Sequence, residues 1–434
     1  MTPQSTFMIV ATIQDGQIAP LRDLLATMTN NPGQADPENR LVPFGRFDRL
    51  HFGRFVIIEA TTAHEIEAFG VTPRPWQPVL TFFGDIDGDA VSFLAELAGQ
   101  AGPGLTEIFA FCEGFSPEGT NLLEWMQAHN IAPAVNYVNW IGRTVRQVRE
   151  EAALHQCLAT YLQENVDAIG RENPRALRQK LLSHVEIEKH AGRLRLTPPA
   201  PTPLGWQIRN FLHKIGVPLM LLLLSPLFII IAPFFAVRLR MLERSDPELF
   251  IRPDRQHVRE MAVQEDHDVT NQYNVFGDVK PGLFRLMTFK FLLLVTGYAA
   301  RHIFNRGFLA RIRTIHFARW VFMDDNHRVF FASNYDGSHE AYMDDFINKV
   351  GWGLNLTFSN GVGYPRTTWL IKEGAYRELP FKYTQRRHQL GSEVWYKAYP
   401  GLTAFDLSRN SRIRQGVETY PTRDAEIRAW LSLI

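Results

Sequence analysis

The feature that most constrains this chain is an internal repeat, because the first third of the sequence recurs in the last third. Three short strings correspond in order, with a slip of one residue in the second and third. The matched segments are 50–56 with 315–321, 82–88 with 330–337, and 111–117 with 358–365. A fourth match is one of spacing, in which His129, Val135, Tyr137 and Trp140 correspond to His388, Val394, Tyr396 and Tyr399. We therefore predict two copies of one module.

Each copy alternates strands and helices in the manner of a small α+β module. In the first copy, strands are expected at 7–14, 50–60, 79–84 and 107–112, with helices at 18–28 and 90–98. The second copy has corresponding segments at 271–279, 283–304 (a long helix), 315–323, 328–333, 338–350 and 355–359. The order β-α-β-β-α-β is that of the ferredoxin-like unit. The predicted fold class is α+β, with two ferredoxin-like (βαββαβ) repeats whose uncovered sheet faces or edges pack together.

Other signals divide the chain into five parts. These are a first repeat at 1–140, a helical segment with a proline-rich tether at 141–206, a membrane anchor with a charged connection at 207–262, a second repeat at 263–415, and a tail at 416–434. In the second part, Asn173 followed by Pro174 is a helix-start signature and predicts a helix to about residue 188.

An uncharged stretch between the copies indicates a membrane anchor. Residues 215–237, about 23 in number, contain no charged side chain and are long enough to cross a bilayer. Pro218, Pro226 and Pro233 interrupt the stretch. A single span would place the two copies on opposite sides of the membrane, where they are unable to pair. We therefore predict a proline-broken hairpin, with a true single span and a buried core hairpin as the alternatives.

A second apolar segment is too short to span a membrane. Residues 291–300 form a run of about ten uncharged residues, half of what a transmembrane helix needs. Basic residues flank it on both sides: Arg285, Lys290, Arg301 and Arg306. This pattern is typical of a helix lying in the membrane interface, assigned to 284–304. The expected location is the cytoplasmic membrane, with the bulk of the protein on the cytoplasmic side.

Composition excludes several classes of protein. The formal net charge is only +1, so the chain lacks the basic field of a nucleic-acid-binding protein. Its two cysteines, Cys112 and Cys157, exclude a disulfide scaffold and fit a reducing compartment. The sequence contains no phosphate loop, nucleophile elbow or dinucleotide fingerprint.

A histidine and an aspartate are expected to meet in both copies. If 315–323 and 328–333 form a hairpin, His316 lies beside Asp336, and the repeat places His51 beside Asp87. A carboxylate raises the pKa of an imidazole and fixes its tautomer, which suits acid–base chemistry or metal ligation. The structural alternative is a satisfied pair at a strand end, with the aspartate capping the next helix.

Two arginines and a third histidine are further candidates. Arg54 and Arg319 follow the paired histidines by three residues, on the opposite strand face. A buried arginine needs a partner, either the carboxylate or propionate of a ligand or a helix C-terminus. His388 lies among basic neighbours and is expected to be exposed, as an axial ligand or as an ordinary surface residue.

One motif and the repeated module resemble the dimeric α/β-barrel superfamily. Residues 84–88 (GDIDG) fit the Gly-x-x-Asp-Gly pattern of dye-decolourising peroxidases, which, like chlorite dismutases, contain two such repeats and bind haem. In the second copy Ser333 stands where the glycine would be. The resemblance covers about half of the chain. It implies roles for seven residues: Asp87 or Asp336 in proton management, Arg54 or Arg319 in polarising peroxide, and His316, His302 or His388 in ligating haem iron.

Two functions of different classes follow. The first is a membrane-associated, haem-dependent peroxidase-type oxidoreductase that takes a lipophilic substrate from the bilayer. The alternative is a non-enzymatic membrane protein that binds a lipid or a protein partner. The expected partners are membrane lipid and a lipophilic small molecule, without nucleic acid. The sequence leaves the oligomeric state open.

Overall fold

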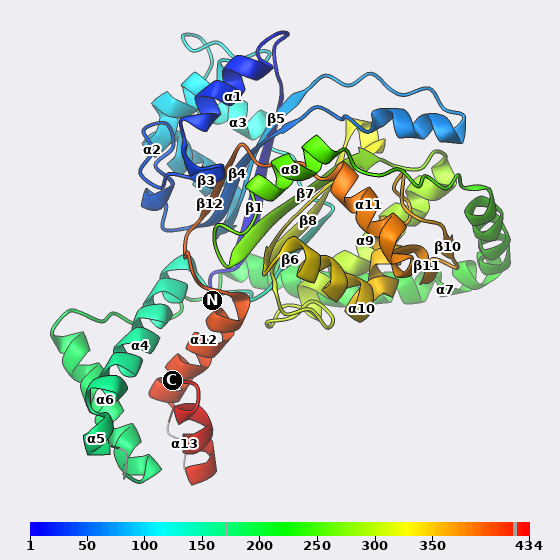
Figure 1. Ribbon diagram of the computed structural model, residues 1–434. Coiled ribbons are helices and arrows are strands. Elements are labelled where there is room, and N and C mark those ends of the chain that lie inside the picture. Colours follow the sequence, from blue (N-terminus) through cyan, green and yellow to red (C-terminus); the bar gives the residue numbers. More distant parts are fainter. Residues whose placement is uncertain (170–171, 420–422) are drawn as a thin grey trace.

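The computed structural model describes residues 1–169, 172–419 and 423–434, and these form an α+β structure with two main, largely antiparallel sheets (Figure 1). The six-stranded sheet has the order β1 (Gln4–Thr12), β5 (Val79–Asp87), β4 (Leu50–Ile58), β12 (Val394–Lys397), β3 (Gly33–Ala35), β2 (Thr29–Asn31). The four-stranded sheet has the order β6 (Val135–Val138), β8 (Ile315–Met323), β9 (Arg328–Asp336), β7 (Thr270–Asp278). A small ribbon joins β10 (Thr367–Thr368) to β11 (Lys372–Glu373).

Each half of the chain contributes a strand to the sheet of the other half. β6 comes from the N-terminal half but pairs with β8, with Val135 opposite Trp320. β12 comes from the C-terminal half but pairs with β4, with Val394 opposite Phe55. This exchange joins the two halves through backbone hydrogen bonds, so neither sheet is completed by its own half.

The two sheets pack against each other, and helices cover their outer faces. Met8, Val56 and Phe83 of the six-stranded sheet meet Val321 and Phe330 of the four-stranded sheet in a shared apolar layer. The helices that cover the six-stranded sheet are α1 (Ile18–Ala26), α2 (Ala90–Phe109) and α3 (Leu122–Ala128). Those that cover the four-stranded sheet are α9 (Leu283–His302), α10 (His339–Phe358) and α11 (Glu378–His388). The molecule is thus built in four layers, helix on sheet on sheet on helix.

A small helical bundle projects from this body (Figure 1). It consists of α4 (Val145–Glu164), α5 (Val166–Ile169), α6 (Pro174–His190), α12 (Ala404–Glu418) and α13 (Asp424–Leu431). Leu154, Leu181, Ile413 and Trp430 belong to its core. The predicted start of α6 is confirmed, because the Asn173 side chain accepts a hydrogen bond from the backbone of Ala176. The remaining elements are α8 (Arg255–Val263) and the short 3-10 turns η1 (Phe44–Arg46), η2 (Ala63–Phe69), η3 (Asp324–Asn326) and η4 (Gly374–Tyr376).

The strands predicted at 107–112 and 355–359 are wrong. These residues lie at and just beyond the ends of α2 and α10, two helices of 20 residues that each depart from helical geometry once, at Ala101 and at Val350. A short apolar run does not distinguish a buried strand from the last turns of a buried helix. The fourth strands are instead β6 and β12, so the order within each sheet is not that of two independent ferredoxin-like units.

The predicted proline-broken hairpin is also wrong, because the apolar segment lies within one helix. α7 (Leu204–Ser245) has 42 residues and contains Pro218, Pro226 and Pro233. A proline inside a helix removes one hydrogen bond and bends the helix, but it does not have to end it. By length and composition, α7 and α9 are the two helices in the described residues apolar enough to cross a membrane.

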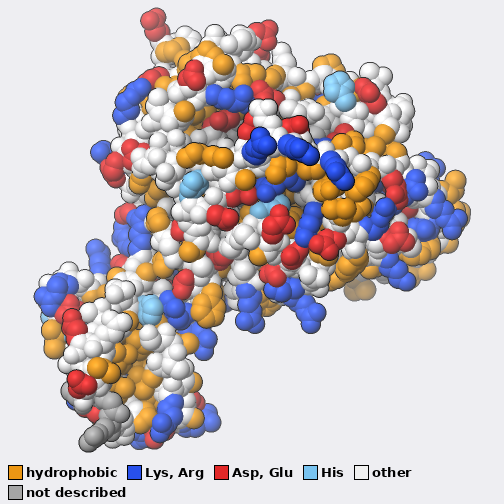
Figure 2. Space-filling model, in the orientation of Figure 1, with side chains coloured by type: hydrophobic (Ala, Val, Ile, Leu, Met, Phe, Trp, Pro, Cys, Tyr) orange, Lys and Arg blue, Asp and Glu red, His pale blue; other side chains and the backbone are white. Residues whose placement is uncertain are grey.

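α7 lies along the body, antiparallel to α9 (Figure 1). Near its start, Trp206 contacts Arg301, and near its end Phe235 contacts Phe284, so the chain directions are opposite. Most of its other side chains are exposed; Leu223 and Phe234 expose 72% and 73% of their surface. Figure 2 shows hydrophobic side chains with Lys and Arg beside them along the lower right edge, where α7 lies.

Candidate functional site

The predicted pairing of histidine with aspartate is confirmed in both halves. His51 Nε2 lies 3.0 Å from Asp87 Oδ1, and His316 Nε2 lies 2.7 Å from Asp336 Oδ1. Both histidines sit at the same irregularity of a hairpin, where the pairing of β4 with β5 and of β8 with β9 slips by one residue. The local sequence therefore forms the same junction twice.

Each aspartate of this junction also holds the start of a helix. The second oxygen of Asp87 accepts a hydrogen bond from the backbone of Val145, the first residue of α4. The second oxygen of Asp336 accepts one from Ala404, the first residue of α12. Burial raises the pKa of the Asp336 carboxyl, but the attraction of His316 and these hydrogen bonds outweigh burial and lower it. Each aspartate therefore caps a helix, as in the structural alternative. The capped helices are α4 and α12, which follow the exchanged strands β6 and β12.

The junction has almost no free space. A single cavity of about 20 Å³ touches both His51 and His316, together with Trp140 and Tyr399. This volume holds about one water molecule. His51, Asp87 and His316 are buried and the Asp336 side chain is 8% exposed, so the geometry around the two histidines fits a structural role. Asp87 also lines a separate groove of about 400 Å³.

Arg54 and Arg319 lie between the two sheets and bind protein groups. Arg319 forms an ion pair with Asp85, and Arg54 donates hydrogen bonds to the amides of Asn274 and Asn334 on the opposite sheet. Burial lowers the pKa of Arg54 to about 9, despite the nearby Asp85 carboxylate. Neither the ligand carboxylate nor the helix C-terminus considered from the sequence is its partner.

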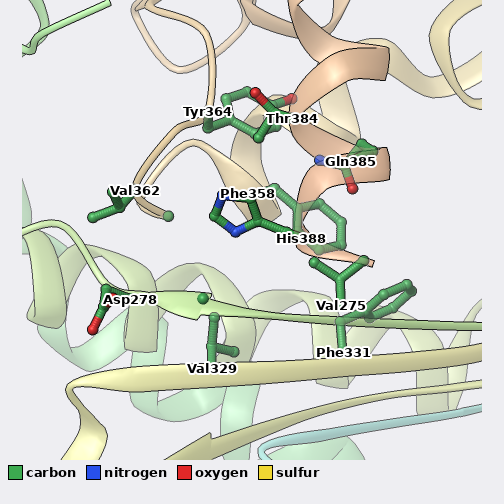
Figure 3. A pocket seen from close by; sticks show the side chains of 12 residues that line it. Val275, Asp278, Val329, Phe331, Phe358, Val362, Tyr364, Thr384, Gln385 and His388 are labelled. Carbon is green, nitrogen blue, oxygen red and sulfur yellow. The ribbon is translucent and has the colours of Figure 1, made fainter. Parts of the chain in front are cut away.

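His388 is buried, which corrects the expectation of an exposed ring. It ends α11, and its Nε2 lies 3.0 Å from Glu65 Oε2, which also forms an ion pair with Arg387. Glu65, which lies in η2, supplies the negative charge that balances the basic residues around His388. Figure 3 shows the imidazole pointing from α11 into a cavity of about 40 Å³, with Asp278 and Val362 on the far side.

The third candidate ligand, His302, lies at the end of α9 against α7. Its Nε2 is 2.9 Å from Nδ1 of His213, so the two rings face each other without room for a metal ion between them. Next to this pair a groove of about 500 Å³ runs between α7, α9, β6 and β1. His302 therefore occupies a different part of the molecule from His316 and His388.

The spaces beside His316 and His388 are too small for haem. His316 borders a space of about 20 Å³ and His388 one of about 40 Å³, far below the several hundred Å³ of a cofactor pocket. The described residues contain no group of three or more His, Cys, Asp or Glu able to hold a metal ion. Arg54 and Arg319, assigned to peroxide, and Asp336, assigned to proton management, bind protein groups. Asp87, also assigned to proton management, lines the separate groove of about 400 Å³ together with Arg49, Ser92 and Thr144.

The cavity best suited to a ligand was not predicted from the sequence. About 190 Å³ lies between α9, α10 and the outer face of β8 and β9. Val295 and Ala299 of α9, Gly353 of α10, and Trp320 and Phe331 of the sheet are among the residues that line it. The lining is almost wholly apolar. The one sequence signal for it is the long apolar helix that crosses this sheet face.

A single polar group in the lining lacks a partner. Trp320 is 5% exposed, and its Nε1–H has no hydrogen-bond acceptor. The other polar lining groups are satisfied within the protein. Tyr137 donates to Asn139, and Thr357 donates to the backbone of its own helix. A ligand in this cavity would meet one hydrogen-bond donor in an apolar environment.

The cavity borders the exposed apolar surface of the molecule. Val295, 41% exposed, and Trp352, 47% exposed, belong to both its lining and the outer surface. Phe291 and Leu294 continue the exposed apolar strip along α9 toward α7. A lipophilic molecule that reaches this strip would therefore be next to the cavity.

The comparisons with known proteins do not add to this description. Searches of family models, curated proteins and solved structures found no match to the chain.

Proposed function

We propose that this protein lies on one face of a membrane and binds an uncharged lipophilic molecule in the cavity between α9, α10 and the four-stranded sheet. The observation that carries this proposal is the continuity between the apolar cavity and the exposed apolar surface of α7 and α9. Large exposed apolar patches on a folded protein mark contacts with a membrane or a partner. An apolar cavity next to such a patch is well placed to receive a lipophilic ligand from it.

The attachment of α7 supports an orientation in the plane of the membrane. Its C-terminal end is fixed to the body by buried Glu243, which accepts hydrogen bonds from the backbones of Trp369 and Leu370. Just beyond, buried Asp246 pairs with Lys280 and Arg285. Because the other end contacts α9 as well, both ends stay on the body, and the exposed side of α7 is free to enter one leaflet.

The fold that accompanies this function is two copies of one α+β module that exchange their last strands. The two matched His–Asp junctions and the two kinked helices of 20 residues support this interpretation. In this form the chain still resembles the dimeric α/β-barrel proteins in its two packed sheets. It departs from two independent modules in tandem, because the fourth strand of each copy completes the sheet of the other copy.

The size and chemistry of the cavity define the ligand class. An apolar cavity of about 150 Å³ is enough for benzene. The present volume of about 190 Å³ therefore takes one ring or a short stretch of acyl or isoprenoid chain, with the rest of the molecule extending through the opening. The Trp320 N–H favours a ligand with a carbonyl or ether oxygen. A charged group would be costly there, because no opposite charge lines the cavity.

A cavity-filling variant tests the binding site. A side chain at Gly353 would meet nothing nearer than Val350 at 4.0 Å, so Gly353→Leu fills the cavity without collision. We expect it to weaken binding of the uncharged fluorophore N-phenylnaphthylamine by about tenfold or more, by displacing its contacts. Gly99→Leu, on the exposed side of α2, is the matched control. Equal binding by both variants and the wild type would refute the site.

The orientation of α7 has its own test. Single cysteines at Thr197 and at Arg252, on either side of α7, are placed in a variant without Cys112 and Cys157. In sealed vesicles, an impermeant thiol reagent should label both from the same side. Labelling from opposite sides would show that α7 crosses the bilayer.

A further inference from the structure

The groove beside the first half of α7 carries cations that the body leaves unneutralised. Its volume is about 500 Å³, and its lining includes Arg209 of α7 and Arg301 of α9. Arg209 donates to the carbonyl of Gly205, and Arg301 donates to the side chain of Asn210 at 2.8 Å. Within the described residues, no carboxylate lies at ion-pair distance from either arginine.

At the opposite end of the same helix pair, two arginines have acidic partners. There Arg240 pairs with Glu243, and Arg285 pairs with Asp246. The exposed Arg238 and Arg244 have no ion pair in the described residues, so the difference between the ends concerns the arginines that face the body. Arg301 is half-buried and Arg209 is exposed. A half-buried guanidinium group without a counter-charge favours the binding of an anion from outside.

The rest of the groove suits an amphipathic molecule at the membrane surface. Trp206 lies under Arg301, with its ring 6.0 Å from the guanidinium carbon, and Tyr298 donates to the backbone of Lys214. Tryptophan, tyrosine and arginine together are typical of the headgroup level of a bilayer. The neighbouring residues Phe211 and Leu212 are about 60% exposed and begin the apolar surface of α7.

We propose that this groove binds the phosphate of an anionic phospholipid, whose acyl chains lie along the exposed side of α7. Arg209 and Arg301 reach the phosphate from two antiparallel helices, and arginine is the side chain best suited to grip phosphate oxygens. The amide oxygen of Asn136, which lines the groove and has no partner, is available to a headgroup hydroxyl. The inference rests on the membrane attachment proposed above, but not on the apolar cavity.

Vesicle binding tests this inference with the full chain. Vesicles of phosphatidylcholine alone are compared with vesicles that also contain phosphatidylglycerol. For the wild type we expect tighter binding to the anionic vesicles. The double variant Arg209→Gln, Arg301→Gln should lose about 30-fold in affinity for them, at about 1 kcal/mol for each basic residue. Its affinity for neutral vesicles should be unchanged.

Matched variants separate a specific site from general charge. Arg255→Gln with Arg259→Gln on α8 removes the same charge elsewhere and should change binding by less than about twofold. Arg209→Lys with Arg301→Lys keeps the charge and should recover part of the loss. If both Gln variants weaken binding equally, or neither does, the headgroup site is refuted.

Two further results distinguish the possible failures. If the wild type binds neither kind of vesicle, membrane attachment itself is wrong, and the headgroup site falls with it. If inorganic phosphate alone binds the wild type tightly, and the double Gln variant does not bind it, the groove serves a soluble anion rather than a lipid. Unchanged N-phenylnaphthylamine binding by the double Gln variant is expected and shows that the apolar cavity is intact.

Discussion

The two halves of the molecule place the same kind of helix over their sheets, but only one half is filled. In α2 and α10, the kinks at Ala101 and Val350 are each followed three residues later by a glycine, Gly104 and Gly353. A side chain on Gly104 would collide with the backbone of Leu41, whereas one on Gly353 would enter open space. The corresponding position is therefore closed in the first half and lines a cavity in the second.

The loop between the first helix and the second strand packs differently in the two halves. In the first half, η1 brings Phe44 against the stacked rings of Phe55 and Phe82. In the second half, the equivalent pair of rings, Trp320 and Phe331, lines the cavity. The loop between α9 and β8 borders the cavity with Phe304, Leu309 and Ala310 but does not fill it. The same architecture therefore holds either a filled core or a cavity beneath the helix, according to how the loop between its first helix and its second strand packs.

Removal of the filling side chain should have the largest effect. Phe44 is fully buried, so Phe44→Ala should cost about 3–5 kcal/mol of unfolding free energy and open a cavity in the first half. Denaturant unfolding in mild detergent measures the loss. Phe405→Ala, at a 67% exposed position, is the control and should change stability by less than about 0.5 kcal/mol. A loss below about 1 kcal/mol for Phe44→Ala would mean that the first half is not tightly filled.

Acid should weaken the contact between the first and the second half of the molecule. Glu65 of the first half binds Arg387 and His388 of the second. Burial raises the pKa of Glu65, but the hydrogen bonds from His388 and Arg387 prevail and lower it from 4.5 to about 2. A carboxyl group whose pKa is lower in the folded protein stabilises the fold at pH values above its unfolded pKa. This stabilisation is lost as the pH falls through the folded pKa. The expected loss is about 3 kcal/mol between about pH 4.5 and 2.

The control for the pH experiment is Glu65→Gln. This variant should be less stable at neutral pH and should lack that part of the acid dependence, as measured by thermal unfolding across the pH range. If the wild type and Glu65→Gln show the same pH profile, Glu65 does not link the two halves.

Substitution of the two equivalent glycines tests the comparison itself. Gly104→Leu should lose about 2–3 kcal/mol, because overpacking against a backbone is relieved only by moving it. Gly353→Leu should be neutral or stabilising by up to about 1 kcal/mol, since leucine favours helix more than glycine does. Differential scanning calorimetry compares the two directly. Equal losses would show that the second half is as tightly packed as the first.

The smallest expected effect concerns the polar group in the cavity. Trp320→Phe removes the unpartnered N–H and keeps an aromatic ring. We expect about fivefold weaker binding of a lipophile that carries a carbonyl oxygen, and no change for a pure hydrocarbon of the same size. Competition with N-phenylnaphthylamine measures both. Equal changes for the two ligands would indicate that the ring, and not its N–H, decides binding.

Short-range patterns in the sequence predicted the parts of the structure that depend on neighbouring residues. The segments at 315–323 and 328–333 predicted a hairpin that places His316 beside Asp336, and the repeat then placed His51 beside Asp87. The Asn173 cap was equally local. The strand exchange escaped prediction because β6 and β12 have only four residues each, and nothing within such a segment specifies which sheet it joins.

The candidate site was harder to predict for a physical reason. A cavity is a difference between the space enclosed and the side chains that fill it, and a sequence gives only the side chains. Gly104 and Gly353 lie at matching places in the repeat, yet their surroundings differ through Leu41, which is distant in sequence from both. The repeated His–Asp pairs have residue types that suit catalysis, but the space shared by His51 and His316 is only about 20 Å³.

Photolabelling identifies the residues that contact a bound lipid chain. The full-length protein is incubated in vesicles with an uncharged diazirine analogue of a lipid chain and irradiated, and the labelled peptides are mapped by mass spectrometry. The account predicts labels on α9 near Val295 and Ala299 and on α10 near Gly353, and their loss in Gly353→Leu. Labels confined to the outer side of α7, or unchanged in Gly353→Leu, would contradict it.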